Sequence, residues 1–277
     1  MDSTSYCQQL ATPPGSNLYY ALLFHEPSAK KKLLALFSLQ LELHRTIVDC
    51  QDPGVARIKL RWWLEEIERL YAEQPRHPVS KLLVDLILEN QLKQNKLEEL
   101  VGVAEQNINP IQHQSFHDML ENNRAHQALT WQLASSVINQ NDDERLAQLA
   151  ALYASVENLK NALPLLNKGY CIFPSDLLEK HQLNADDLRC EPDALRNKAL
   201  LTDLFSQLEF ELNLSLQELT GNSLKLPLFA LCLAGIARAN CTLLLNQQDL
   251  RQLPASSITP LRKLWISWKT NRHYHRN

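Results

Sequence analysis

Glycine is scarce in this sequence, with only 6 among 277 residues, whereas leucine is abundant. Long glycine-free stretches that place Glu, Lys, Gln and Ala between apolar residues favour helices over sheets. The composition therefore predicts an all-α fold. The length fits a single domain over residues 1–277 with one large core, and we expect residues 1–16 to form a loose N-terminal arm.

The cysteines lack the CxxC spacing of zinc and redox sites and the density of disulfide-stapled secreted domains. We expect reduced thiols that mostly pack in the core, at Cys7, Cys50, Cys171, Cys190, Cys232 and Cys241. The first residues include an acid and contain neither an arginine nor an apolar run, unlike a signal or transit peptide. The most apolar stretch, 226–236, is shorter than the roughly 18 residues that cross a bilayer. These features predict a cytoplasmic location.

Positive charge is not in excess, because 28 Lys and Arg stand against 31 Asp and Glu, a net charge of -3. Nucleic-acid binding normally needs clustered Lys and Arg, so we exclude that class of partner. A local exception is the C-terminal segment 269–276, which is basic and contains an aromatic residue. This segment is either a peripheral contact to an anionic membrane or a solvated tail.

Several prolines follow a residue that can cap a helix, and proline is well suited to the first helical position. Asp52-Pro53, Asn109-Pro110 and Thr259-Pro260 each form such a pair. Together with the apolar periodicity, these signals predict helices near 28–49, 53–73, 76–105 with a break, 110–139, 143–166, 192–220, 223–247 and 258–272.

Two of these predicted helices, 28–49 and 143–166, are apolar on most sides. Charged side chains on them must pair with one another or line a ligand cavity, because burying an unpaired charge is costly. These side chains are Glu42, His44 and Arg45 on the first helix and Glu157 and Lys160 on the second. Structural pairing and a ligand cavity both remain open.

Candidate metal ligands are present but are better explained otherwise. His113, His117 and Glu121 have the i, i+4 spacing of zinc ligands on a helix, yet no fourth ligand is identifiable, which favours an exposed helix face. Acid pairs that resemble magnesium ligands lie at helix boundaries, where capping explains them. These pairs are Asp49 with Asp52 and Asp186 with Asp187. We predict no metal site.

Several blocks of sequence occur in the order found in one protein family. They are Tyr19-Tyr20-Ala21-Leu22-Leu23-Phe24, Leu33 to Glu42, Asp52-Pro53, Val55-Ala56, Lys59-Leu60, Trp62-Trp63, Leu70-Tyr71-Ala72, Pro75 to Val79, Phe173 to Leu178, His181 and Leu183. Taken together, the blocks resemble squalene/phytoene synthases, the head-to-head type of trans-isoprenyl diphosphate synthase. The resemblance covers most of the chain and is strongest over 17–80 and 150–183.

The resemblance implies an antiparallel helical bundle of the isoprenoid synthase type around a central cavity. In that family, two aspartate-rich motifs on facing helices bridge Mg²⁺ to the diphosphate of a prenyl substrate. An isoprenoid held in such a cavity is expected to contact Tyr20, Phe37, Leu41, Arg45, Glu157, Lys160 and Asn161.

The sequence departs from the family where those aspartates belong. The first acidic pair falls on His44 and Arg45 and the next aspartate on Val48, while Asp49 is one position, or about 100°, out of phase. The second motif, Asn-x-x-Arg-Asp, aligns with Asn161, Pro164 and Leu165 at its Asn, Arg and Asp positions. We therefore expect no catalytic residues and no cofactor, with Mg²⁺ binding only if the site has been rebuilt.

The same loss occurs in a phytoene-synthase-like group that includes a mitochondrial complex I assembly factor. Glu121-Asn122 and the run from Leu264 to Lys269 are similar to that group. The leading hypothesis is a non-catalytic member that binds an isoprenoid, another lipid or a protein partner.

Two alternatives stay open beside it. One is an active farnesyl or geranylgeranyl diphosphate transferase with a rebuilt site, in which His44, Arg45 and Lys160 contact the diphosphate. Any metal would then be held by Glu42, Glu121 or Glu157. The other is a helical scaffold with a filled cavity.

Overall fold

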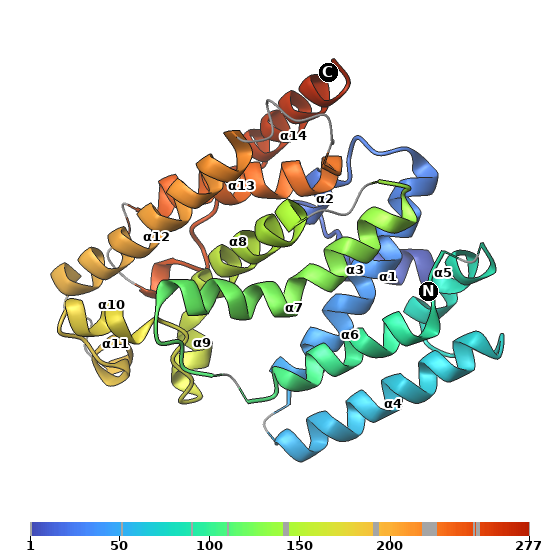
Figure 1. Ribbon diagram of the computed structural model, residues 1–277, viewed down its shortest axis with the longest axis horizontal. Helices are drawn as coiled ribbons and strands as arrows, with labels where there is room; N and C mark the ends of the chain where they lie inside the picture. The colour runs from blue at the N-terminus through green and yellow to red at the C-terminus, as the bar shows by residue number, and fades with distance from the viewer. Residues whose placement is uncertain are drawn as a thin grey trace. The chain divides into compact units, whose positions relative to one another are not determined.

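The computed structural model describes residues 2–50, 52–89, 91–109, 111–140, 144–190, 194–217, 226–245, 247 and 250–276. Within these ranges the regular secondary structure is helical and no strand occurs, so the predicted all-α fold is confirmed. The helices in Figure 1 are α1 Ser3–Ala11, α2 Asn17–Ala21, α3 Pro27–Val48, α4 Pro53–Tyr71, α5 Pro78–Leu88, α6 Gln94–Gln106, α7 Phe116–Val137, α8 Glu144–Lys160, α9 Ala162–Asn167, α10 Ser175–Lys180, α11 Ala185–Cys190, α12 Ala194–Gln217, α13 Leu228–Leu244, the 3₁₀ turn η2 Leu250–Gln252 and α14 Pro260–Tyr274.

Two of the proline-marked helix starts form as predicted. The Asp52 carboxylate accepts hydrogen bonds from the Gly54 and Val55 amides at the start of α4. The Thr259 hydroxyl accepts one from the Arg262 amide at the start of α14. Each cap satisfies amides that have no partner inside the helix.

The third proline-marked start is wrong in position. Pro110 lies outside the described residues, and α7 begins at Phe116 rather than at 110. The preceding backbone is used elsewhere, because the carbonyls of His113 and Gln114 accept hydrogen bonds from the Ser175 and Asp176 amides. A tertiary contact thus replaces the first helical turns.

The first residues do not form the loose arm that was expected. They form α1, which contacts α3 and α5, and Cys7 and Ala11 on it are buried. The Asp2 carboxylate caps the helix by accepting a hydrogen bond from the Ser5 amide at 2.6 Å. The burial of Cys7 and Ala11, together with a hydrogen bond from the Tyr6 hydroxyl to Glu42 of α3, attaches this segment to its unit.

One compact unit comprises residues 1–109, 129–143 and 226–229. Helix α3 contacts α1, α4, α5 and α6. Every residue from Leu33 to Leu39 is buried, as predicted for a helix enclosed on most sides. The predicted break between 76 and 105 separates α5 from α6.

The second unit comprises residues 110–128, 144–225 and 230–277. Helix α8 packs against α12, and its residues 149–152 and 154–156 are buried, which confirms its predicted central place in a core. The helix expected to reach 166 instead breaks at Asn161, and α9 follows. The assignment of the whole chain to a single domain stays a prediction.

The cysteines with described side chains carry free thiols, and four of these five are buried. Burial raises the pKa of Cys232 to about 12 and also raises those of Cys7 and Cys171. These thiols therefore pack as small apolar groups. Within the ranges described, no helix is both long enough and apolar enough to cross a membrane.

Candidate functional site

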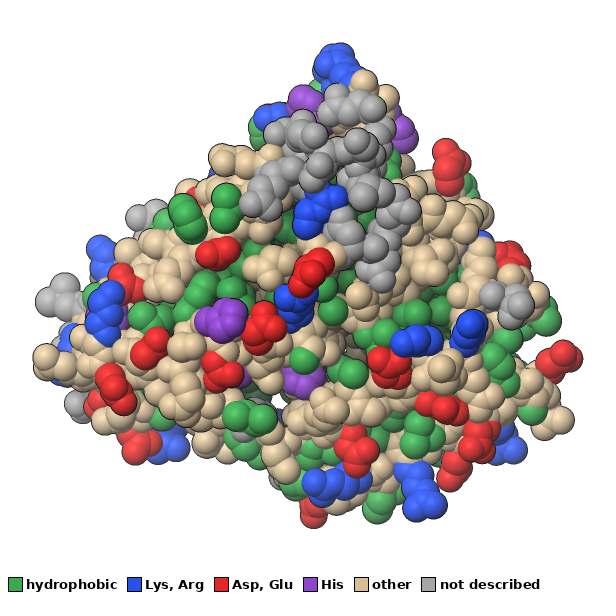
Figure 2. Space-filling view, viewed as in Figure 1, with side chains coloured by type: hydrophobic (Ala, Val, Ile, Leu, Met, Phe, Trp, Pro, Cys, Tyr) green, Lys and Arg blue, Asp and Glu red, His purple; other side chains and the backbone are tan. Residues whose placement is uncertain are grey.

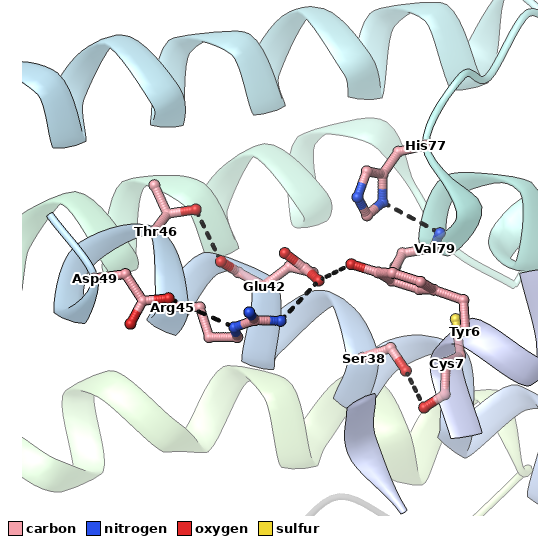
Figure 3. A network of polar contacts seen from close by, with 9 residues as sticks. All are labelled: Tyr6, Cys7, Ser38, Glu42, Arg45, Thr46, Asp49, His77 and Val79. Carbon is pink, nitrogen blue, oxygen red and sulfur yellow. Dashed lines mark hydrogen bonds and ion pairs between the residues drawn. The ribbon is translucent and has the colours of Figure 1, made fainter. Parts of the chain in front are cut away.

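Two of the polar residues predicted on α3, Glu42 and Arg45, form a network at its C-terminal end (Figure 3). The Tyr6 hydroxyl of α1 donates a hydrogen bond to the Glu42 carboxylate at 2.5 Å. The Arg45 guanidinium lies 3.7 Å from the same carboxylate oxygen and 3.6 Å from the Asp49 carboxylate. One cation thus contacts both acids on the last turns of α3.

The side chains of this network differ in their exposure to solvent. The Glu42 side chain is 14% exposed, whereas those of Arg45 and Asp49 are more than half exposed. Burial, followed by the hydrogen bond to Glu42, raises the pKa of Tyr6 to about 12. The phenol therefore stays protonated and keeps donating to Glu42 at neutral pH.

Beside this network, His77 lies against three aromatic side chains. The His77 imidazole is edge-on to the rings of Trp63, Trp62 and Tyr6, with centroids 4.8, 6.0 and 5.6 Å away. Its Nδ1 accepts a hydrogen bond from the Val79 amide, which places the proton of the neutral ring on Nε2. Burial lowers the pKa of His77 although nearby acids oppose this, so the neutral form is favoured.

Glu66 holds the loop that carries His77. Its Oε1 accepts hydrogen bonds from the Arg76 and His77 amides, both at 2.7 Å, and its Oε2 accepts one from Arg69 Nε at 2.8 Å. The side chain is fully buried. Burial alone would raise the pKa of Glu66, but these hydrogen bonds outweigh it and the pKa lies below its usual value.

The second predicted cluster lies at the end of α8 in the other unit. Lys160 Nζ is 3.5 Å from the Glu157 carboxylate, and Lys160 is only 6% exposed. Lys263 of α14 is equally buried, and its pKa is lowered by burial and by the charge of Lys160, against the opposing charge of Glu157. Two buried lysines and one carboxylate therefore act on one another here.

Sequence reasoning missed a buried amide network in the same unit. The Asn123 side chain of α7 donates to the Ser155 hydroxyl and accepts from the Asn158 side-chain amide, each at 2.8 Å. Ser155 in turn donates to the Ala151 carbonyl. The available signal was the register of Asn123, which follows the buried Met119 by four residues and so falls on the apolar face of its helix.

Metal-ligand spacing on α7 is not realised. His113 precedes the helix, so it does not share a helical face with His117 and Glu121. In the described part of the chain, no group of three His, Cys, Asp or Glu side chains is placed to hold a metal ion. Asp186 and Asp187 lie at the start of α11, where their amides donate to the Asn184 side chain and Asp187 accepts a hydrogen bond from the Asn184 amide. Asn184 therefore caps the helix, and of the two acids only Asp187 takes part in the cap.

Comparison with known proteins decides the family. A model of the squalene/phytoene synthase family matches residues 11–249. The chain belongs to the squalene/phytoene synthase family. No curated protein sequence matches it.

Solved structures share the fold of this protein over nearly its whole length. A dehydrosqualene synthase in complex with a ligand has a TM-score of 0.75 and 11% identity, covering 99% of this chain and 97% of that chain. The squalene synthase HpnC from Alicyclobacillus acidocaldarius has a TM-score of 0.61 and 15% identity, covering 99% and 94%. TcSQS with the ligand E5700 has a TM-score of 0.65 and 11% identity, covering 98% and 90%. The predicted isoprenoid synthase fold is confirmed.

In this family member, the residues at the expected motif positions lie near the C-terminal end of α3 and just after α8. His44 and Val48 are exposed on α3, next to the paired Arg45 and Asp49. Asn161 follows α8 and donates a hydrogen bond to the Glu157 carbonyl. Pro164 is exposed and Leu165 half-buried, both within α9.

The remaining ligand-binding candidates differ in exposure. Phe37 is 4% exposed and packs edge-on against Phe229, with ring centroids 5.6 Å apart, as part of the core of its unit. Leu41 and Tyr20 are half-buried, and the Tyr20 ring is edge-on to Tyr19. The roles of these side chains in ligand binding stay predictions.

Proposed function

We propose that this family member has lost the magnesium-dependent condensation of prenyl diphosphates and binds an isoprenoid chain without a metal. The observation that carries the proposal is the position of Arg45. Its guanidinium lies between the Glu42 and Asp49 carboxylates, at 3.7 and 3.6 Å, where the family resemblance places an acid. The acids nearest to the expected magnesium position are therefore already paired with a cation.

The argument concerns local charge rather than fold stability. Magnesium in diphosphate chemistry is held by carboxylates together with substrate oxygens. An exposed ion pair adds little to stability, but the fixed guanidinium charge opposes a divalent cation at the same carboxylates. The residues present do not fit a magnesium–diphosphate site at this end of α3.

The second expected motif supports the same proposal. Leu165 stands where the resemblance places an aspartate, and Pro164 stands where it places an arginine. The nearest charged residues before them on α8 are Glu157 and Lys160, which form an ion pair with each other. We infer that neither set of acids remains.

Calorimetry with farnesyl diphosphate tests this proposal. We expect farnesyl diphosphate to bind with equal affinity in the presence of Mg²⁺ and of a chelator. We also expect farnesol to bind, because the isoprenoid chain of the ligand rather than its diphosphate supplies the affinity. Release of inorganic diphosphate is expected to be absent. Binding that requires Mg²⁺ would show the proposal to be wrong.

A charge variant makes the test sharper. Arg45→Gln keeps most of the side-chain volume but releases Glu42 and Asp49, so Mg²⁺ should now change the affinity for farnesyl diphosphate. Arg57→Gln on α4 is the matched control, because Arg57 is similarly exposed and lies 3.9 Å from the Glu105 carboxylate. If both variants respond to Mg²⁺ in the same way, the role of Arg45 is refuted.

Two other functions have specific support. The buried pair Lys160 and Lys263 beside Glu157 favours a transferase with a rebuilt site, since cations can stabilise a diphosphate leaving group without a metal. Metal-independent diphosphate release that is lost in Lys160→Met, but kept in the exposed control Lys168→Met, would support it.

The resemblance to the complex I assembly factor group favours a protein partner. Failure of the protein to bind farnesyl diphosphate and farnesol would support this alternative.

A further inference from the structure

Helix α14 has an inverted distribution of polarity. Its apolar residues face outward: Leu261 is 78% exposed, Leu264 36%, Trp265 55% and Trp268 44%. Their spacing of i, i+3, i+4 and i+7 places them on one helical face. The helix therefore presents a continuous apolar stripe, defined by these four residues, away from the core of its unit.

The opposite face of α14 holds the helix in place with polar and small contacts. Lys263 and Ser267 are buried there. Ile266 lies against Gly235 of α13, where an added Cβ would come within 3.1 Å of the Ile266 methyl group. Because the inward face is already packed, the outward stripe is not needed to attach α14 to its unit.

Cations accompany the apolar stripe. Lys269 Nζ lies 5.2 Å from the centroid of the Trp265 ring, and the Arg272 guanidinium lies 5.5 Å from that of Trp268. From Leu250 to the C-terminus the sequence has six Lys or Arg and no Asp or Glu, although the whole chain is acidic. Figure 2 shows Lys, Arg and His side chains at the end of the chain that Figure 1 marks C.

We propose that α14 docks on the surface of an anionic lipid membrane through this stripe. Tryptophan and leucine on one face, with Lys and Arg beside them, are the chemistry of a helix that lies in the headgroup region. The cations stacked on both indole rings place positive charge at the depth of the lipid headgroups. A second copy of this chain would bring like charges together, so the charge pattern favours lipid over self-association.

Sedimentation of the full chain with lipid vesicles tests the docking. We expect binding to vesicles of phosphatidylcholine mixed with phosphatidylglycerol, weaker binding to phosphatidylcholine alone, and weakening by salt. Replacing both cations in Lys269→Gln/Arg272→Gln should reduce the affinity by roughly fivefold for each charge. Equal binding to neutral and anionic vesicles would overturn the proposal.

Trp265→Ala/Trp268→Ala tests the apolar part, with an expected loss of about tenfold or more in vesicle affinity. Ile58→Ala is the matched control, because Ile58 is 70% exposed on α4, outside the stripe, and should leave the affinity unchanged. Circular dichroism verifies that each variant is folded. Full vesicle binding by a folded double variant would refute the assignment to α14.

A protein occupant gives a different result. If a second copy covers the stripe, sedimentation velocity without lipid shows a dimer that Trp265→Ala/Trp268→Ala dissociates, and the membrane proposal fails. The vesicles contain no isoprenoid, and the calorimetry of the proposed function contains no vesicles. The two proposals therefore succeed or fail independently.

Discussion

Two replacements of Glu66 should distinguish how much its charge and how much its hydrogen bonds contribute to the free energy of unfolding. Oε1 accepts both loop amides and Oε2 accepts Arg69, so Glu66→Gln can keep the amide bonds through its remaining oxygen. Its new NH₂ group then faces Arg69 Nε, and two donors meet. Glu66→Ala removes all three hydrogen bonds at a position that is fully buried.

The two variants should differ in stability by a measurable amount. Losing a hydrogen bond to a charged partner costs about 1.5 to 3 kcal/mol, which is the expected loss in the free energy of unfolding for Glu66→Gln. Glu66→Ala leaves the half-buried Arg69 guanidinium and two amides without this partner, and we expect a loss of about 3 to 5 kcal/mol. In an Arg69→Met background, Glu66→Gln should cost much less.

Denaturant unfolding of the parent protein and of the four variants, Glu66→Gln, Glu66→Ala, Arg69→Met and Arg69→Met/Glu66→Gln, measures these differences from the transition midpoints. Equal losses for Glu66→Gln and Glu66→Ala would refute the division of roles between the two oxygens. So would a loss for Glu66→Gln that is the same with and without Arg69.

The pH dependence follows from the sign of the pKa shift. The pKa of Glu66 is lower in the folded protein than its usual value of 4.5, so its ionised form stabilises the fold. This stabilisation is fully present above pH 4.5 and is lost as the pH falls through the lower folded pKa. Glu66→Gln should remove this part of the acid dependence, and an unchanged acid profile would contradict it.

Two further predictions concern buried hydrogen bonds. Tyr6→Phe removes the donor to the Glu42 carboxylate and should lower the free energy of unfolding by about 1 to 2 kcal/mol, which thermal or denaturant unfolding measures; an unchanged midpoint would count against the 2.5 Å bond. Asn123→Ala leaves Ser155 and Asn158 without their shared partner and should cost about 2 to 3 kcal/mol. In that background Ser155→Ala should cost less than in the parent protein, and strict additivity would argue against the network.

Much of the helical framework could be predicted locally. Asp52-Pro53 and Thr259-Pro260 start helices because a capping oxygen and a fixed proline φ act within one turn. The apolar runs on α3 and α8 indicated enclosed helices, since the buried stretches 33–39, 149–152 and 154–156 carry no charged side chain. The start of α7 could not be predicted, because its upstream carbonyls bond to amides about 60 residues further along the chain.

Only part of the candidate site could be predicted by the same reasoning. Arg45 and Lys160 were recognised as charges that need partners, and both form ion pairs within their own helices. Tyr6 was missed as a partner of Glu42 because the contact joins residues 36 positions apart. Asn123 was missed because an amide on an apolar face identifies no particular partner.

The sequence by itself determined that this protein is helical, where α3, α4, α8 and α14 begin to within two residues, and that its charges on α3 and α8 require partners, because caps, propensity and periodicity act over a few residues. Only the tertiary structure decided which face of α14 is buried. Periodicity alone assigns the apolar side of a helix to the core, yet on α14 packing against α13 used the other side and left the leucine and tryptophan stripe exposed. That outcome depends on residues distant in the chain, so no local pattern contains it.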